Sequence, residues 1–345
     1  MAEKKKIILG ISCGDINGIG LETLLKSFSN NNFFDFCIPV LYAPQSAINY
    51  YKKLYSLDGL NYYVINNPKQ ASLKQMNVIK YFDQSIEMNL GESDKVAAKI
   101  AIQSLDLVMQ DVKNNLVNVL LTLPVNKQSI SVVKKDFVGH TEYLSEKFGN
   151  TESLMLLCSN NLRIATATNH VPISGVSKLI TKSLLEQKIK ILIKTLKIDF
   201  LISNPKIAVL SLNPHGGDNG LIGKEDCEII RPTIDFFFNK GDLIYGPYSA
   251  DGFFGSGNYK NFDAVLGMYH DQSLIPFKTI SFGDGVNYTA GLPIIRVSPA
   301  HGVGYDIAGK GVANTSSLSS AIFLSLQLYS NRKLYYEAIR KRETI

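Results

Sequence analysis

Short apolar runs alternate with amphipathic segments along most of the chain, and each kind has the length of one secondary-structure element. The apolar runs typical of strands cover residues 7–12, 38–42, 117–123, 154–158, 164–168, 207–212, 264–268 and 294–297. The segments with helical spacing cover residues 21–28, 47–55, 184–198, 226–238 and 318–339. Ser93 is placed to cap a further long amphipathic helix. Strands separated by helices indicate βαβ units, so the pattern predicts an α/β fold with a largely parallel sheet.

The length and composition are those of an ordinary globular protein. The chain has 345 residues, which suits two lobes better than one compact core. Hydrophobic residues make up 45% of it and charged residues 19%, as is usual for this class. The formal net charge of +6 is mild and spread along the chain. It suits anionic small substrates but not nucleic acid, whose binding favours a basic stripe with interleaved aromatic residues.

The sequence carries no sign of export or of a membrane anchor. The four cysteines are far apart and form no C-x-x-C pair, as is typical of reduced thiols in cytosolic proteins; they are Cys13, Cys37, Cys158 and Cys227. The lysines at positions 4–6 lead straight into the first strand without a signal-peptide pattern. No apolar stretch approaches the ~20 residues of a membrane span. We therefore expect a cytoplasmic protein without a membrane partner.

A glycine-rich turn, GDINGIG at residues 14–20, follows the first predicted strand and precedes the first predicted helix. Such turns hold phosphate in many nucleotide-binding proteins. The dinucleotide motif G-x-G-x-x-G requires a third glycine, but Thr23 stands in its place after Gly18 and Gly20. The chain also lacks a glycine-rich loop that ends in Lys-Ser or Lys-Thr. A nucleotide cofactor is therefore expected at another site.

The chain has five histidines, and each lies in a turn-like stretch beside an apolar segment. They are His140, His170, His215, His270 and His301. In open α/β sheets, ligands gather beyond the carboxyl ends of strands. Three imidazoles with one open position form a catalytic zinc-type site, and His170, His215 and His270 are candidates for it. Their spacing alone specifies no metal, so histidines that cap helices or stabilise loops remain the alternative.

Two aspartates accompany these histidines. Asp271 directly follows His270, where a carboxylate can orient a metal ligand or move a proton. Asp251 lies in GPYSADGFF, where a simple turn aspartate explains it equally well.

Residue types that bind anions gather between positions 278 and 296. Lys278, Asn287 and Thr289 fall in this stretch, and Arg296 lies inside the apolar run LPIIRVS. A charge in such a run must be paired or must face a ligand at the end of the strand. A planar guanidinium suits phosphate or carboxylate, and an internal ion pair is the other interpretation.

A series of stretches resembles, in the same order, the motifs of the 4-hydroxythreonine-4-phosphate dehydrogenase family. They are GDINGIGLE, TLPVNK, GHTEYL, TNHVP, LNPHGGDNGLIGKED, GPYSADGFF, DAVLGMYHDQSLIPFK and GLPIIRVSPAHGVGYDIAGKGVAN. The resemblance runs from residue 7 to about residue 315. MYHDQ together with LNPH is its most specific part.

The resemblance implies an oxidoreductase of pyridoxal 5'-phosphate (vitamin B6) biosynthesis. The family oxidises the secondary hydroxyl of 4-phosphohydroxy-L-threonine with NAD or NADP, and the resulting β-keto acid loses carbon dioxide to give 3-amino-2-oxopropyl phosphate. It uses a divalent metal, with zinc, magnesium and cobalt as the candidates. Three histidines drawn from both subunits of a homodimer hold this metal, so the resemblance implies an active site at the subunit interface.

Carried over motif by motif, the resemblance assigns the site residues. The metal ligands are His170, His215 and His270. The substrate contacts are His140, Thr141, Lys278, Asn287 and Arg296. Departures from the family pattern are minor, at Ile16-Asn17, Gly216, Asp218 and Ser273. The proton-moving residue stays undecided among Asp251, Asp271 and Lys278.

The family's fold resembles that of isocitrate and isopropylmalate dehydrogenases, a two-lobed α/β/α structure with the active site in the cleft between the lobes. The resemblance places residues 1–138 plus 288–345 in a first lobe on the nucleotide side. It places residues 139–287 in a second lobe that carries the metal and the dimer contacts.

The stretch HGVGYDIAGKGVAN resembles the loop that holds the adenosine half of NAD in those dehydrogenases. Its glycines let the backbone approach a ligand closely. The implied cofactor contacts are His301, Gly302, Asp306 and Asn314. The turn at residues 14–20 is then expected to be a wall of the cleft, with a helix N-terminus that faces an anion.

Three other activities stay open. A paralogue that oxidises a related phosphorylated hydroxy acid, such as threonate 4-phosphate, keeps the same motifs. A metal-dependent hydrolase also uses three histidines and nearby carboxylates but needs no adenosine loop. A phosphate acyltransferase shares a related two-lobed fold but needs no three-histidine metal.

Overall fold

The computed structural model describes residues 6–30, 33–81, 86–137, 139–160 and 162–343. These residues group into two compact units. The first unit comprises the described residues of Met1–Asn150 and Pro293–Tyr329, and the second comprises those of Thr151–Leu292 and Ser330–Ile345.

The strands of the first unit lie in the order β3-β4-β2-β1-β5-β12, and the pairings described between them are parallel. Their bounds are β1 (Ile7–Ser12), β2 (Cys37–Tyr42), β3 (Tyr62–Ile65), β4 (Met76–Ile79), β5 (Val119–Thr122) and β12 (Ile295–Pro299). Gly10 lies opposite Val40 on one side and Leu120 on the other. β2 and β5 are buried throughout, as expected of continuous apolar runs in a sheet that is covered on both faces.

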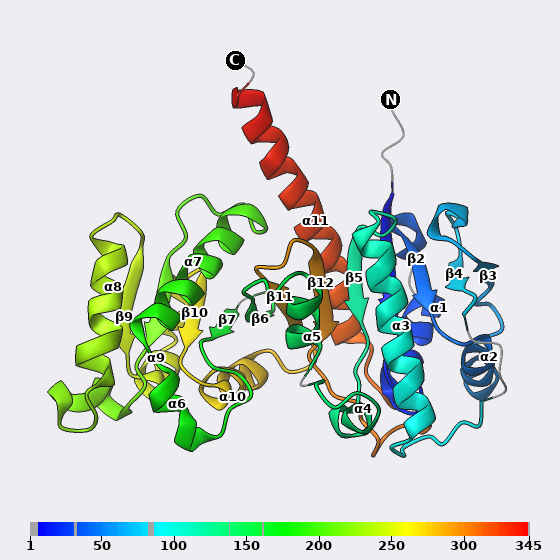
Figure 1. Cartoon of the computed structure of the whole chain (residues 1–345), viewed down its shortest axis with the longest axis horizontal. Helices are drawn as coiled ribbons and strands as arrows, with labels where there is room; N and C mark the ends of the chain where they lie inside the picture. The colour runs from blue at the N-terminus through cyan, green and yellow to red at the C-terminus, as the bar shows by residue number, and fades with distance from the viewer. Residues whose placement is uncertain (1–5, 31–32, 82–85, 138, 161, 344–345) are drawn as a thin grey trace. The chain divides into compact units, whose positions relative to one another are not determined.

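Helices connect these strands and pack on them. They are α1 (Ile19–Asn30), α2 (Gln45–Leu54), α3 (Lys95–Lys113), α4 (Lys127–Val133), α5 (His140–Lys147) and the first part of α11 (Ser316–Glu343), with the short turns η1 (Phe33–Asp35) and η2 (Pro68–Gln70). α3 packs along β1, β2 and β5 (Figure 1). Its cap is Asp94 and not the expected Ser93, because the Asp94 carboxylate accepts from the amides of Val96 and Ala97 at 3.1 and 3.4 Å. An ionised cap also interacts favourably with the positive end of the helix dipole.

The strands of the second unit lie in the order β11-β6-β7-β10-β8-β9. Their bounds are β6 (Leu154–Cys158), β7 (Arg163–Thr166), β8 (Ile207–Leu210), β9 (Ile244–Tyr248), β10 (Ala264–Gly267) and β11 (Val286–Ala290). β7, β10, β8 and β9 pair in parallel, but β6 is antiparallel to β7 and to β11. The turn from β6 to β7 is tight, with the Ser159 amide donating to the Leu162 carbonyl at 2.9 Å. A connection this short permits only antiparallel pairing of β6 with β7. The sheet is thus largely parallel, as predicted, with β6 as the exception.

The helices of the second unit surround these strands. They are α6 (Ile173–Leu179), α7 (Lys182–Ile198), α8 (Arg231–Phe238), α9 (Ala250–Gly255) and α10 (His270–Ile280), with the turns η3 (Pro214–Gly220), η4 (Asp226–Ile230) and η5 (Asn258–Asn261). The segment 226–238, expected as one helix, begins with the π-helical turn η4. Ile164, Val265 and Phe277 belong to one buried cluster that holds α10 against β7 and β10.

A buried ion pair ties the end of α11 to the second unit. The Arg332 Nε donates to the Asp199 Oδ1 at 2.6 Å, and its Nη2 donates to the Oδ2 at 2.9 Å. The Tyr288 hydroxyl donates to the same carboxylate at 2.6 Å. The compact units group residues 330–345 with the second unit and residues 139–150 with the first, whereas the sequence had suggested the reverse for both segments.

The predicted α/β fold class is confirmed, since strands and helices alternate in both units. β1 and β6 have the predicted bounds, whereas β3, β4, β9 and β11 were not expected from the sequence pattern. Within the described residues, no helix is both long enough and apolar enough to cross a membrane.

Candidate active site

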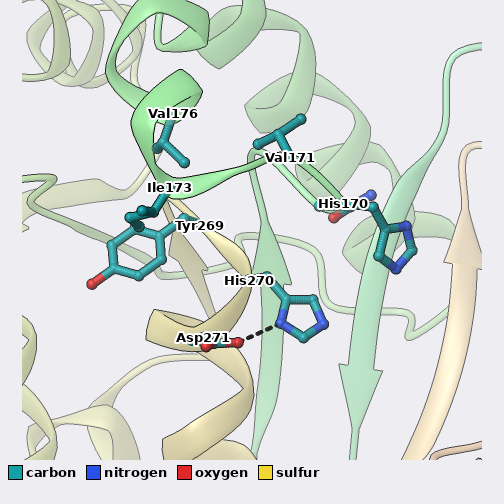
Figure 2. A pocket seen from close by; sticks show the side chains of 8 residues that line it. His170, Val171, Ile173, Val176, Tyr269, His270 and Asp271 are labelled. Carbon is teal, nitrogen blue, oxygen red and sulfur yellow. Dashed lines mark hydrogen bonds and ion pairs between the residues drawn. The ribbon is translucent and has the colours of Figure 1, made fainter.

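Two of the three candidate metal ligands, His170 and His270, lie in one open pocket of the second unit (Figure 2). The pocket has a volume of about 310 Å³. It is lined by Asn169, His170, Val171, Ile173, Val176, Tyr269, His270 and Asp271 and is called the histidine pocket below. The centroids of the two imidazole rings are 5.9 Å apart. The sequence pattern had placed these residues at strand ends, and the structure brings them together.

Three adjacent parallel strands position the predicted metal ligands. His170, His270 and His215 follow the carboxyl ends of β7, β10 and β8, respectively, and β10 lies between the other two strands. This is the edge at which α/β sheets bind ligands. The Ala167 amide donates to the Gly267 carbonyl at 2.8 Å, and the Gln272 amide group donates to the Ser211 carbonyl at 2.7 Å. These bonds tie the three connections to one another.

The His270 ring is oriented by its sequence neighbour. His270 begins α10, and its Nδ1 lies 2.6 Å from the Asp271 Oδ1. Figure 2 shows the Asp271 carboxylate on one side of this ring and the other ring nitrogen on the opposite side. A carboxylate hydrogen-bonded to one nitrogen fixes the orientation of an imidazole and raises its basicity as a ligand. Asp271 is thus in place to orient a ligand, one of the two roles considered for it.

His215 is exposed on the η3 turn and does not line the histidine pocket. The backbone of residues 215–219 has positive φ throughout, which is uncommon for side chains other than glycine. The buried Asp226 stabilises the start of this turn, since its carboxylate accepts from the amides of Leu212 and Asn213 at 2.8 and 3.0 Å. The strained turn, specified by Gly216, Gly217 and Asp226, therefore sets where His215 stands.

The donor set of the histidine pocket fits a divalent cation of the zinc type. Imidazole nitrogens bind zinc at ~2.0–2.1 Å, and two rings 5.9 Å apart are close to the separation at which both reach one ion. Among the residues that the structure describes, no group of three or more His, Cys, Asp or Glu side chains is close enough to hold a metal. The metal site as a whole, with His170, His215 and His270 as its ligands, therefore stays a prediction.

The substrate residues predicted in the first unit surround a buried guanidinium. Arg296 on β12 is 2% exposed, and its Nε and Nη2 donate to the Thr122 hydroxyl on β5 at 3.1 and 2.5 Å. Burial lowers the pKa of Arg296 to about 10, and the nearby Glu142 carboxylate opposes the shift. Arg296 therefore stays charged at neutral pH, in an orientation that Thr122 fixes.

His140 and Thr141 begin α5, in the same unit as Arg296. Burial, and then the positive charges of Arg296 and Lys127, hold the pKa of His140 well below its usual range. The ring is therefore neutral at neutral pH and can donate a hydrogen bond without adding charge. The sequence reading did not predict a role for three residues around this site, Thr122, Lys127 and Glu142, although all three lie in the quoted motifs TLPVNK and GHTEYL.

The two remaining substrate residues belong to the second unit. Lys278 is exposed near the end of α10, and Asn287 lies on β11. The Asn287 Oδ1 is buried and has no hydrogen-bond partner among the described residues. Such an atom calls for an explanation, and a ligand is one of the ordinary ones. The predicted substrate set is thus divided between the two units.

The predicted cofactor contacts lie in residues 301–314 of the first unit, called the cofactor segment below. Gly302 faces open space and Asp306 is exposed, so both are accessible to a ligand. The His301 Nε2 is buried without a hydrogen-bond partner in the described part of the chain, and burial lowers the pKa of this ring. The Asn314 Oδ1 accepts from the Ser316 amide at 2.7 Å, so Asn314 also has a structural role at the start of α11.

Two expectations from the sequence find no support in these contacts. The Ile19 amide at the start of α1 donates to the Val303 carbonyl at 2.9 Å, so this amide faces protein rather than the expected anion. Asp251 is exposed on α9 and does not line the histidine pocket. A role for Asp251 in proton transfer rests on the family resemblance alone.

Comparison with known proteins gives a consistent result. Residues 35–325 match the family described as "Pyridoxal phosphate biosynthetic protein PdxA". The chain is 43% identical over 332 residues to a 4-hydroxythreonine-4-phosphate dehydrogenase of Bacteroides thetaiotaomicron, a match that covers 96% of this chain and 91% of that protein. It is 39% identical over 325 residues to the enzyme of that name from a Sulfurihydrogenibium species, covering 94% and 99% of the two chains. The crystal structure of 4-hydroxythreonine-4-phosphate dehydrogenase from Klebsiella pneumoniae is similar with a TM-score of 0.79 and 28% identity, covering 94% of this chain and all of that one.

Proposed function

The chain belongs to the PdxA family of pyridoxal phosphate biosynthetic proteins, and on that premise we propose that it is a 4-hydroxythreonine-4-phosphate dehydrogenase. It oxidises 4-phosphohydroxy-L-threonine with NAD or NADP and releases 3-amino-2-oxopropyl phosphate and carbon dioxide. The observation that carries this proposal is the 43% identity to a relative of that name over 96% of the chain. The pairing of His170 with His270 at the carboxyl ends of β7 and β10 supports it independently.

His170, His215 and His270 are the residues that would hold a divalent cation: zinc, magnesium or cobalt. When bound, such a cation favours ionisation of the substrate hydroxyl and polarises the ketone that forms. Asp271 keeps the His270 ring in orientation through its 2.6 Å contact with Nδ1. Asp251, Asp271 and Lys278 are all exposed. Asp271 and Lys278 are the preferred candidates for moving the hydroxyl proton, because both lie on α10, the helix that His270 begins.

The anionic ends of the substrate are bound by the residues that the family resemblance assigns to substrate contact. Arg296 binds phosphate or carboxylate through its planar guanidinium, which Thr122 holds in a fixed orientation. The neutral His140 ring and the Thr141 hydroxyl act as uncharged donors beside it. Lys278 and Asn287 are the two further substrate contacts that the family resemblance implies.

The nicotinamide cofactor is held by the cofactor segment through His301, Gly302, Asp306 and Asn314. Gly302 offers backbone with open space around it, and Asp306 offers an exposed carboxylate. A bound nicotinamide would supply the hydride acceptor, and these residues would supply its position.

The enzyme acts as a cytoplasmic homodimer with its active site at the subunit interface. Large apolar side chains are exposed on the elements that carry the histidine pocket and just beyond α10: Ile173 is 72% exposed, Ile275 65% and Phe282 90%. Exposed apolar groups of this size beside a polar site are typical of protein–protein contacts.

A comparison of substrates tests this function directly. The purified protein is incubated with 4-phosphohydroxy-L-threonine or with threonate 4-phosphate, each with NAD or NADP and with zinc, magnesium or cobalt. We expect reduced nicotinamide to accumulate fastest with 4-phosphohydroxy-L-threonine, together with carbon dioxide. Faster reduction with threonate 4-phosphate would identify the paralogous dehydrogenase. Release of inorganic phosphate without nicotinamide reduction would identify a hydrolase.

A further inference from the structure

The turn at residues 14–20, called the supporting turn below, is bound to the cofactor segment inside the first unit. The Tyr305 hydroxyl donates to the Asp15 Oδ2 at 2.6 Å, and the Ile19 amide donates to the Val303 carbonyl at 2.9 Å. A β-carbon on Gly18 would stand 2.6 Å from the Val303 carbonyl oxygen, so the two backbones approach each other as closely as glycine allows. The GDINGIG motif, which does not fit the dinucleotide pattern, therefore packs against the cofactor segment.

A third stretch, residues 89–92, lies against both. The Asn17 side chain is fully buried, and its Oδ1 accepts from the Asn89 amide at 3.1 Å. The Gly91 amide donates to the Asn17 carbonyl at 2.9 Å, and a β-carbon on Gly91 would stand 2.9 Å from the Tyr305 carbonyl oxygen. The cofactor segment is therefore supported from one side by two other parts of the chain.

The cofactor segment depends on this support because it has little regular structure of its own. No helix or strand is assigned between β12 and α11. The hydrogen bonds between its own backbone groups are those of short turns, from the Ile307 amide to Gly304 and from the Lys310 amide to Ile307. Side chains from elsewhere must therefore fix its conformation.

Asp15 is the central group of the support. It is 2% exposed, and its Oδ1 accepts from the Asn17 amide at 2.9 Å while its Oδ2 accepts from Tyr305. Burial and the adjacent carboxylate raise the pKa of Tyr305, so this hydroxyl keeps its proton and is the donor. A buried carboxylate is costly unless it is hydrogen-bonded, and both Asp15 oxygens have partners here. One partner shapes the supporting turn, and the other fixes the cofactor segment.

We infer that Asp15 and Tyr305 are positioning residues for the nicotinamide cofactor. Their hydrogen bond holds residues 302–306 in the conformation that presents the Gly302 backbone and the Asp306 carboxylate to the dinucleotide. The inference rests on the proposed function in that the cofactor segment must be the site of the adenosine half. It adds a role for the GDINGIG motif that does not involve contact with phosphate.

The test measures NADH affinity directly, by fluorescence titration or calorimetry without substrate, alongside steady-state kinetics. Tyr305→Phe removes only the hydroxyl. Asp15→Asn keeps the shape of the side chain and one of its two acceptor oxygens, since the amide nitrogen can only donate. Asp15→Ala removes the carboxylate. We expect Tyr305→Phe and Asp15→Ala to weaken NADH binding roughly ten- to thirtyfold, as for loss of one charge-assisted hydrogen bond. The KM for NAD should rise in parallel, kcat should change less than about threefold, and Asp15→Asn should recover part of the affinity. The double variant should be no worse than the poorer single variant, because both changes remove one interaction.

Tyr42→Phe is the matched control, since Tyr42 donates to the Asp111 carboxylate at 2.5 Å in the same unit, and neither residue belongs to the supporting turn or to the cofactor segment. It should lower the midpoint of thermal unfolding and leave NADH affinity unchanged. NADH affinity within twofold of wild type in Tyr305→Phe would overturn the inference. An equal loss of affinity in Tyr42→Phe would overturn it as well, since the effect would then be one of general stability. Should Asp15→Ala fail to fold, Tyr305→Phe and Asp15→Asn still decide. A protein that binds NADH normally but reduces no NAD with any phosphorylated substrate would instead contradict the proposed function.

Discussion

The histidine pocket and the cofactor segment are built in opposite ways. In the pocket, the chemistry lies on exposed side chains at the ends of buried strands: His170 and Asp271 are exposed, and the His270 side chain is 37% exposed. In the cofactor segment, the accessible groups depend on the buried Asp15 and Asn17, which come from a distant part of the chain. Changes in the pocket should therefore affect chemistry and spare stability. Changes beneath the cofactor segment should affect both.

The largest effect is expected in the histidine pocket. His270→Ala removes a proposed metal ligand, so the affinity for the divalent metal and kcat/KM should both fall by more than ~100-fold. The free energy of unfolding of the metal-free protein should change by less than about 0.5 kcal/mol, because the ring is partly exposed. Metal analysis, kinetics and urea unfolding measure the three quantities. Thr279→Ala, another change on α10 that removes only a bond to the Ile275 carbonyl, should leave metal content and activity unchanged. Full metal content in His270→Ala would remove the distinction between the two regions.

A smaller effect is expected at Arg296, which shares the buried character of the first unit but faces the substrate in our proposal. Arg296→Ala should raise the KM for the phosphorylated substrate roughly ten- to a hundredfold, the usual result of losing a charge-assisted contact. NADH affinity should stay within about twofold. Thr122→Val, which removes only the hydroxyl that orients Arg296, should raise the same KM by less. Equal losses of substrate and NADH affinity would mean that Arg296 stabilises the unit and does not bind substrate.

Asp271→Asn tests the histidine pocket more finely, because it changes an exposed group that acts through His270. Replacing a carboxylate that orients a metal-bound imidazole typically weakens metal affinity by ten- to a hundredfold. Because Asp271 is exposed, we expect a loss of metal affinity at the lower end of this range, ~10-fold. Competition with a chelating dye measures it. Tenfold more metal should restore most of the activity. Failure of added metal to do so would indicate that Asp271 moves the proton itself.

The smallest effect concerns pH and the first unit. The pKa of His140 is held well below its usual range, so the unfolded state, with a pKa near ~6.5, binds this proton more readily than the folded state. The stabilisation that follows is fully present above about pH 6.5 and is lost as the pH falls below it. Urea midpoints between pH 7 and pH 5.5 should therefore drop less in His140→Asn than in wild type.

The contrast also explains what the sequence predicted and what it did not. Continuous apolar runs such as β1 and β6 were predicted to the residue because burial on both faces leaves little choice of side chain. β9 contains glycine and proline, which obscure its strand pattern. β11, with the sequence VNYTA, does alternate apolar and polar residues, and this short period-two pattern was overlooked. His170 and His270 were identified because imidazoles at strand ends are recognisable by type and place. Asp15 and Tyr305 are 290 residues apart in the sequence, so no local pattern predicts that the fold brings them into contact.

The ion pair between Asp199 and Arg332 of α11 constrains the order in which the two units can fold during synthesis on the ribosome. Asp199 is made long before Arg332, yet the carboxylate is 3% exposed and depends on that guanidinium for its charge partner. A nascent second unit thus has every one of its strands through Ala290 but still contains an unneutralised buried anion, which strongly disfavours closure of its core. The first unit is also incomplete until β12 has been made, and β12 is made after the whole of Thr151–Leu292. Both units therefore complete their folding only after β12 and the part of α11 that carries Arg332 have been made, and a chain truncated after Tyr329 should be degraded as an unfolded protein.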